Sequence, residues 1–147
     1  MKQADLLDVN VWVALADENH THHQKARGYW MNQSAPKVAF TRATMLGMIR
    51  LLINPVVMQN KPFALAEAIS AYKAFRALPE VIWVDEGQKA ATQVDDILAQ
   101  WIASNKITPH MWTDSYLASL AISTECRIVS FDGDFRRFKG LSLLHLI

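Results

Sequence analysis

The chain of 147 residues is long enough for one domain with a sizeable buried core, because 51% of its residues are hydrophobic. Its formal net charge of +1 excludes a protein that coats nucleic acid through a general basic excess, so a nucleic-acid partner would be held by a local patch or by a metal ion. A single cysteine excludes an intrachain disulfide, and no apolar run reaches the roughly 18 residues of a membrane span, so we expect a cytoplasmic protein without membrane contact.

Short apolar runs alternate with helical segments along the chain. The expected strands are residues 4–7, 38–40, 81–84 and 127–131, with a fifth at 141–147. Helices are expected from Val11 and over about 22–31, 43–53, 63–78, 88–104 and 113–125, where apolar residues recur at helical spacing. Thr113 is expected to cap the last of them. This alternation predicts a single three-layer α/β/α domain, residues 1–147, around a mainly parallel sheet of about four or five strands.

Aspartates stand where functional sites form in such sheets, at the carboxyl ends of strands. Asp8 follows the first strand and Asp132 the fourth, Asp134 comes two residues later, and Asp114 lies in the first turn of the preceding helix. If these carboxylates meet, their repulsion must be relieved by protons or a cation, and oxygen ligands select Mg²⁺ or Mn²⁺. The alternative for each aspartate is a structural cap, the role expected of Asp85 after the third strand.

Four stretches carry a more specific signal when taken together. They are residues 6–15, which contain Asp8-Val9-Asn10, residues 20–26, residues 41–52, and residues 112–118 with 130–135. In this order, over nearly the whole chain, they resemble the PIN domain of VapC-type toxins from toxin–antitoxin systems. The resemblance implies a metal-dependent endoribonuclease that is inhibited by a small antitoxin and is often dimeric.

The resemblance also implies roles for individual residues. Asp8 and Asp114 would be the principal metal ligands, and Asp132 would complete a catalytic acidic cluster around Mg²⁺ or Mn²⁺. Three accessory polar groups are expected near them: Asn10, Thr44 and Asp134.

Three arginines are candidates for contacts with the RNA backbone: Arg42, Arg136 and Arg137. Arg136 and Arg137 form a short basic run with Lys139 directly after the acidic residues 132–134. A structural arginine at position 42 and a solvated turn at 136–139 are the alternatives.

Met45 departs from the family pattern, because many PIN domains carry Glu there and some relatives carry Gln. A thioether is a poor Mg²⁺ ligand, and no Asp or Glu occurs between Glu18 and Glu67. This favours an alternative function, a catalytically weakened PIN domain that acts mainly by binding RNA or its antitoxin. A metal-dependent phosphohydrolase on another α/β scaffold is a third hypothesis, but the chain has Asp8-Val9-Asn10 rather than Asp-x-Asp and lacks a Walker-type loop.

Two helical segments, residues 43–53 and 63–78, are rich in Met, Leu, Phe and Tyr for so small a domain. Some of this surface is expected to stay apolar and exposed in a monomer, which marks an interaction site. The partners expected at this surface are a second copy of the chain, a cognate small antitoxin or both, and the alternative is that both helices are simply core. The RNA substrate is a partner that the resemblance implies.

Overall fold

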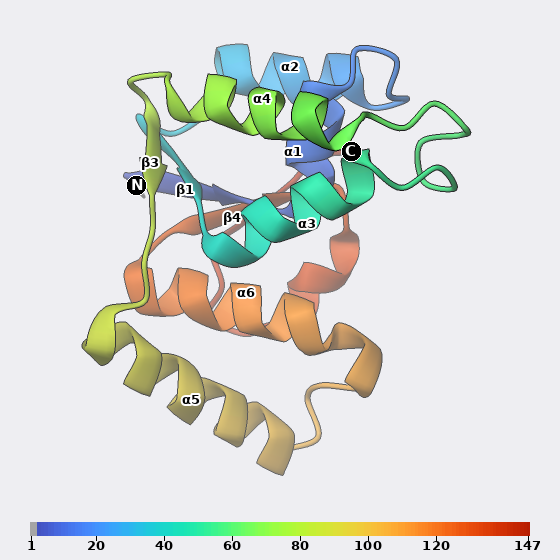
Figure 1. The fold of residues 1–147 in the computed structure, drawn as a ribbon. Helices are drawn as coiled ribbons and strands as arrows, with labels where there is room; N and C mark the ends of the chain where they lie inside the picture. Colours follow the sequence, from blue (N-terminus) through green and yellow to red (C-terminus); the bar gives the residue numbers. More distant parts are fainter. Residues whose placement is uncertain (1–2) are drawn as a thin grey trace.

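A five-stranded, all-parallel sheet forms the centre of the computed structural model, which describes residues 3–147 (Figure 1). The strands are β1 (Ala4–Leu7), β2 (Lys37–Phe40), β3 (Val81–Trp83), β4 (Arg127–Ser130) and β5 (Leu143–His145). Their order across the sheet is β3-β2-β1-β4-β5, and every neighbouring pair is parallel. The predicted α/β class is confirmed, and the fifth strand is present but spans three residues rather than seven.

Helices cover both faces of the sheet. One layer contains α1 (Val9–Ala16), α2 (His23–Asn32), α3 (Arg42–Leu52) and α4 (Leu65–Arg76), and the other contains α5 (Gly87–Ala103) and α6 (Trp112–Thr124) (Figure 1). Two short 3₁₀ helices, η1 (Pro109–Met111) and η2 (Gly133–Arg137), flank α6 and β4. Within residues 3–147, no helix has the length and apolar character needed to cross a membrane.

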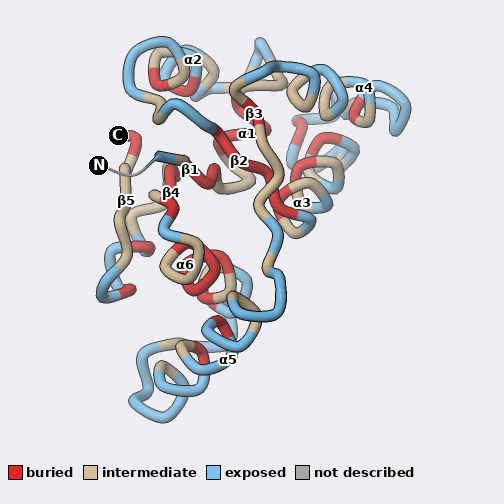
Figure 2. The backbone as a smooth tube through the Cα atoms, turned by 90° about the vertical axis from the view of Figure 1, so that its left-hand side faces the viewer, coloured by how far each residue is buried: buried red, intermediate tan, exposed pale blue. Residues whose placement is uncertain are grey.

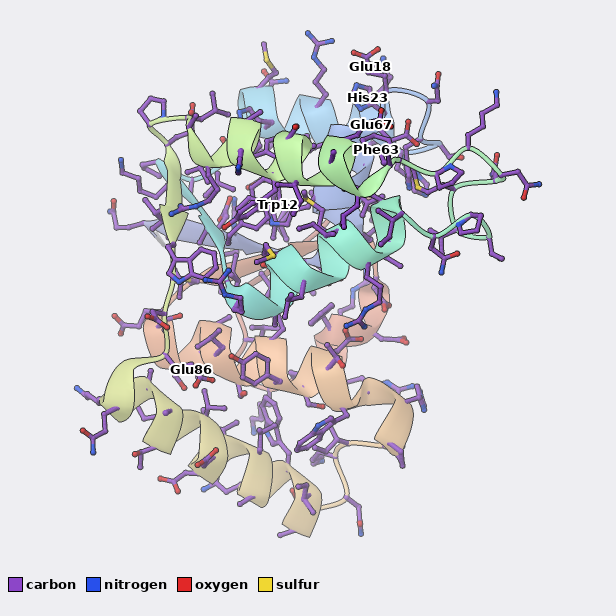
Figure 3. The ribbon with its side chains drawn as sticks, viewed as in Figure 1. Trp12, Glu18, His23, Phe63, Glu67 and Glu86 are labelled. Carbon is purple, nitrogen blue, oxygen red and sulfur yellow. The ribbon has the colours of Figure 1, made fainter. Side chains whose placement is uncertain are left out.

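Alternate residues of each strand serve two separate cores, as the two-residue period of a strand requires. Leu7 packs with the buried residues of α1 to α4, whereas Leu6 packs with those of α5 and α6. In the first core Trp12 stacks on Phe40 with ring centroids 3.7 Å apart, and Figure 3 shows it beneath α4. Figure 2 shows that the most buried parts of the sheet lie in β1, β2 and β4, that the edge strand β5 is intermediate, and that much of α5 is exposed. The two cores hold the sheet between its helical layers.

A buried ionic network occupies the amino ends of β1 and β4. Asp5 is fully buried and accepts hydrogen bonds from Tyr29 Oη at 2.5 Å, from the Ala35 amide at 2.9 Å and from Arg127 Nε at 2.8 Å. Burial, together with the Asp5 carboxylate, raises the pKa of Tyr29 above its usual range. This network satisfies a buried charge and joins α2 to two strands, at the end of the sheet opposite the aspartates discussed next.

Candidate active site

The strand order places a topological switch point between β1 and β4, because the chain extends the sheet from β1 toward β3 and then resumes on the other side of β1. Ligands of open α/β sheets bind at such a point, at the carboxyl ends of the strands. The register pairs Leu7 with Val129, and the Asp8 amide donates to the Val129 carbonyl at 2.9 Å. Asp8, which follows β1, therefore lies beside Ser130, the last residue of β4.

Ser130 connects the polar groups of this site. Its side chain is fully buried, and its hydroxyl donates to Asp8 Oδ2 at 2.7 Å. Ser130 Oγ also accepts from the Asp132 amide at 2.9 Å and from Asn10 Nδ2 at 3.4 Å. Asn10 Oδ1 in turn accepts from the Phe131 amide at 3.4 Å. One hydroxyl thus orients the Asp8 carboxylate and fixes the start of the loop that carries Asp132.

The sequence analysis assigned no role to Ser130. A serine two residues before Asp132 is an ordinary strand-end residue, and only its register opposite Asp8 reveals its function. The signal that could have found it is the pairing of β1 with β4, which brings Ser130 beside Asp8 although the two residues lie 122 positions apart in the chain.

Four carboxylates form one electrostatic unit, which we call the acidic cluster: Asp8, Asp114, Asp132 and Asp134. Burial, followed by the charges of the other three members, raises the pKa of Asp114 to about 6. Burial also raises the pKa of Asp8, against the opposing effect of its hydrogen bonds from Ser130 and Val9, and the charge of Asp132 contributes. The one salt bridge within residues 3–147 joins Arg127 to Asp5, so no Lys or Arg neutralises the acidic cluster.

The donor chemistry of the acidic cluster fits a hard divalent cation, because its side chains offer oxygen atoms and repel one another. In the described part of the chain, no three His, Cys, Asp or Glu side chains converge closely enough to hold an ion by themselves. Mg²⁺ does not require such a cage, since it usually keeps several waters and binds through one or two carboxylates plus substrate oxygens. The cluster therefore fits an open Mg²⁺ or Mn²⁺ site better than a closed structural one.

The loop that carries Asp132 is packed against His145 of β5. His145 Nδ1 lies 2.7 Å from Arg136 Nη2, and its Nε2 lies 3.0 Å from the Phe131 carbonyl oxygen. Because a guanidinium only donates, Nδ1 must accept and Nε2 must donate. A Cβ on Gly133 would come within 3.2 Å of the His145 ring, so the loop passes closely over it. His145, to which the sequence analysis also assigned no role, therefore packs against the loop that carries Asp132 and holds it in place.

Asp132 and Asp134 differ in exposure within this loop. Asp132 Oδ1 caps η2 by accepting from the Asp134 amide at 2.9 Å, whereas the Asp134 side chain is exposed. The structure brings Asp132 to Asp8 through Ser130 and leaves Asp134 at the rim of the site.

Thr44 and Met45 occupy the start of α3. Thr44 is buried and forms a reciprocal capping box with Thr41, in which each side chain accepts from the other's backbone amide. The side chain of Met45 is half-buried and packs against the core formed with α1 to α4. Thr44 thus has a structural partner for its hydroxyl, and Met45 contributes apolar packing where the family pattern has an amide or carboxylate.

The three arginines expected to contact RNA are exposed, and each also has one contact within the protein. The guanidinium carbon of Arg42 lies 4.4 Å from the centroid of the Trp83 ring. Arg136 bonds to His145, as described above, and Arg137 Nη1 lies 3.3 Å from Met111 Sδ. All three extend from elements that begin or end at the carboxyl edge of the sheet.

Comparison with known proteins identifies relatives along the whole chain. The family model of the PIN domain matches residues 6–141. Ribonuclease VapC41 of Mycobacterium tuberculosis is 33% identical over 145 residues, which cover 94% of this chain and 95% of that protein. Ribonuclease VapC44 of the same organism is 30% identical over 128 residues, covering 86% of this chain and 84% of that protein.

Solved structures share the fold at low sequence identity. The DNA-bound VapBC complex of Salmonella typhimurium aligns with a TM-score of 0.66 at 18% identity, covering 98% of each chain. VapC20 of Mycobacterium tuberculosis, a toxin that cleaves the sarcin-ricin loop, aligns with a TM-score of 0.64 at 16% identity, covering 90% of this chain and 92% of that one. These alignments support the three-layer architecture described above.

Proposed function

This chain belongs to the PIN-domain family, in which its relatives are VapC ribonucleases, and from that premise we propose that it is a Mg²⁺-dependent endoribonuclease, the toxin of a VapBC-type module. The observation that carries the proposal is the acidic cluster. Asp8, Asp114 and Asp132 come from three different elements and interact electrostatically at the switch point of the sheet, with no Lys or Arg paired to them among residues 3–147. The mutual repulsion of these carboxylates is costly unless a bound cation neutralises it.

The proposed reaction is hydrolysis of an RNA phosphodiester bond. Asp8 and Asp114 would hold Mg²⁺ or Mn²⁺, with Asp132 completing the cluster, and the bound ion would supply a water of lowered pKa and positive charge for the phosphate. The protein's own contribution is orientation. The Ser130 hydroxyl directs Asp8 Oδ2, while Asn10 holds the backbone before Asp132. Both contacts limit the rotation of the ligands before substrate arrives.

A cognate small antitoxin is the proposed protein partner, and the proposed location is the cytoplasm. The VapBC complex of Salmonella typhimurium and the VapBC2 complex of Rickettsia felis share the fold of this chain. The apolar surface that the chain exposes on α3 and α4 supports the same partner and also a homodimer.

A second candidate function rests on Met45. Because Met45 places a thioether where many relatives offer a carboxylate or amide oxygen, metal affinity would be lower in this chain. A protein with this defect would act mainly by binding RNA or antitoxin, with weak cleavage or none.

The test of the proposed function is the substitution Asp8→Asn. Asparagine keeps the shape, and its one carbonyl oxygen can accept from either Ser130 or the Val9 amide, so the fold should survive while one negative ligand is lost. We expect cleavage of single-stranded RNA to fall by at least about 100-fold, which corresponds to about 2.7 kcal/mol in the barrier. The measurement is the cleavage rate in saturating Mg²⁺, with circular dichroism as the check on folding.

The matched control is Asp95→Asn, which removes the same charge from an exposed position on α5. It should cleave RNA like the unaltered protein. Full activity in well-folded Asp8→Asn protein would remove Asp8 from the site. If the unaltered protein binds RNA but cleaves none at any metal concentration, the weakened-domain function takes precedence.

A further inference from the structure

A cavity of about 540 Å³ lies between the carboxyl end of α5 and the segment that follows β4, outside the acidic cluster. Its volume falls in the range of about 300–1,000 Å³ that small-molecule sites occupy. The residues that matter for its chemistry are an amide, two aromatic rings and three cations: Gln100, Trp101, Phe138, Lys106, Arg137 and Lys139.

The polar lining of the cavity is cationic. Lys106, Arg137 and Lys139 line it, and no Asp or Glu is among its lining residues. None of the three forms a salt bridge within residues 3–147, where Arg127 and Asp5 make the single pair. In a chain with a net charge of only +1, three cations around one hollow give this cavity a local positive charge. Phosphate groups are the anions that lysine and arginine hold on nucleic-acid surfaces.

The apolar lining is aromatic. Trp101 is half-buried, and its ring packs against Phe138 with centroids 4.9 Å apart and planes inclined by 30°. Phe138 itself is buried, so it fixes the indole from the core side. An aromatic ring held beside cations suits an unpaired base with its phosphate, since the base stacks while the phosphate is neutralised. An acidic peptide would use the cations but would leave the indole without a matching group.

The cavity is joined to the acidic cluster by η2. This helix begins directly after Asp132 and ends at Arg137, so at about 2 Å rise per residue the two ends lie about 10 Å apart. Arg137 Nη1 also contacts the sulfur of Met111, which directly precedes α6 and its Asp114. The two sites are therefore linked through η2 and through the contact of Arg137 with the start of α6.

We propose that this cavity is a nucleotide-binding subsite of the RNA strand, displaced from the phosphodiester that is cleaved by the length of η2, about 10 Å. Lys106, Lys139 and Arg137 bind the backbone phosphate there, and Trp101 stacks on the unpaired base. The proposal rests on the proposed function, since it assumes that RNA is the substrate.

The first experiment measures binding without cleavage. The double variant Lys106→Gln, Lys139→Gln removes two cations, and the control Lys25→Gln, Lys73→Gln removes two exposed lysines from α2 and α4 in the opposite layer. The dissociation constant of a labelled single-stranded RNA is measured in chelator over a range of salt concentrations. We expect the double variant to bind about tenfold more weakly and its log–log salt slope to decrease by about 1.4, while the control keeps the slope of the unaltered protein.

The second experiment separates binding in the cavity from cleavage. For a substrate that extends at least four nucleotides on both sides of the cut, the double variant should show a KM about tenfold higher with unchanged kcat. For a substrate truncated to one nucleotide on each side, the double variant and the unaltered protein should have the same KM. Trp101→Phe keeps a ring and should preserve affinity for the long RNA, whereas Trp101→Leu should weaken it about tenfold.

The outcomes distinguish the two proposals. If the unaltered protein cleaves RNA and the double variant matches the control in KM and salt slope, the subsite is wrong and the ribonuclease proposal stands. Failure of the unaltered protein to bind or cleave any RNA would overturn both. If the double variant keeps its RNA affinity but is no longer inhibited by the cognate antitoxin, the cavity binds protein, and the RNA assignment is overturned.

Discussion

Asp114 is the residue through which pH acts most directly on the acidic cluster. Its pKa in the folded protein is about 6, raised first by burial and then by the charges of Asp8, Asp132 and Asp134, against an ordinary value of 3.8. Between these two values the folded state holds more protons than the unfolded state. The ionisation of Asp114 therefore lowers the stability of the metal-free protein as the pH rises from about 4 through about 6.

The corresponding prediction concerns Asp114→Asn. In chelator, the melting temperature of the unaltered protein should fall relative to that of the variant as the pH rises from about 4 to about 7, because asparagine does not ionise. Thermal melts at four or five pH values measure this difference, with Asp95→Asn on exposed α5 as the control. Parallel pH profiles for the unaltered protein and Asp114→Asn would show that the ionisation of Asp114 does not destabilise the folded protein.

Met45 is the residue at which this chain departs from the family pattern. We predict that Met45→Glu lowers the Mg²⁺ or Mn²⁺ concentration for half-maximal cleavage by about tenfold, because it adds a carboxylate ligand. The melting temperature in chelator should fall, since the change adds repulsion and removes apolar packing from the core of α1 to α4.

Leu46→Glu is the matched control for this change, because Leu46 is the next residue of α3 and 51% exposed. It adds the same charge toward solvent and should leave the metal titration unchanged. If the metal titrations and melts of Met45→Glu coincide with those of the unaltered protein, Met45 does not face the metal and the third motif is misaligned.

At the scale of elements, the contact between α1 and α3 positions Asp8. Gly47 of α3 faces Val9, the residue directly after Asp8, and a Cβ on Gly47 would lie 2.6 Å from Val9 Cγ2. No side chain fits between the two helices at this point. The glycine therefore sets how closely α3 approaches the helix that Asp8 caps.

We predict that Gly47→Ala destabilises the protein by about 1–3 kcal/mol, because the overlap outweighs the higher helix propensity of alanine. Gly28→Ala is the control, since a Cβ on Gly28 of α2 meets nothing within 4 Å and should gain up to about 1 kcal/mol. Urea denaturation gives both values. Equal stability changes of the same sign would mean that α3 moves freely relative to α1.

The start of α6 corrects one expectation from the sequence. Thr113 does not cap this helix, because α6 begins at Trp112 and its N-cap is Met111, which makes no side-chain capping bond. The 3₁₀ helix that begins with Pro109 runs directly into α6 and supplies its first turn. Thr113 is consequently exposed inside the first turn of the helix, next to Asp114.

At the scale of the whole molecule, exposed apolar side chains gather on α3, the loop after it and the start of α4. The most exposed are Val56 at 85%, Leu65 at 60% and Leu46 at 51%. Leu46 and Leu65 lie within residues 43–53 and 63–78, where apolar surface was expected, whereas Val56 lies in the loop between these segments and was not part of the expectation. Such a surface is costly in water unless a partner covers it.

We predict that the double variant Val56→Asp, Leu65→Asp disrupts a homodimer, antitoxin binding or both, with affinity reduced at least about tenfold. Ile102→Asp is the control, because Ile102 is 54% exposed on α5 in the opposite layer. Sedimentation and inhibition of cleavage by the antitoxin measure the two associations. A monomeric unaltered protein, together with equal inhibition of all three proteins, would contradict the prediction.

The sequence by itself determined the fold class and the identity of the main acidic residues. Hydrophobic runs of strand and helix length are local properties, so β1 was predicted with its observed bounds and the α/β alternation was confirmed. Aspartates that directly follow strands must lie at the carboxyl edge of a parallel sheet, so the strand pattern alone was enough to place Asp8 and Asp132 there. Asp114 was a third candidate from its place in the first turn of the helix before β4, and the family resemblance gave it the expected role of a principal metal ligand.

The tertiary structure decided which distant segments meet at that edge. Ser130 reaches Asp8 only because β4 pairs with β1, and His145 supports the Asp132 loop only because β5 pairs with β4. The cationic cavity likewise combines Lys106 from beyond α5 with Arg137 and Lys139 from beyond β4. Each of these contacts depends on strand order, which follows from the packing of whole helical layers on the sheet and which no local sequence pattern encodes.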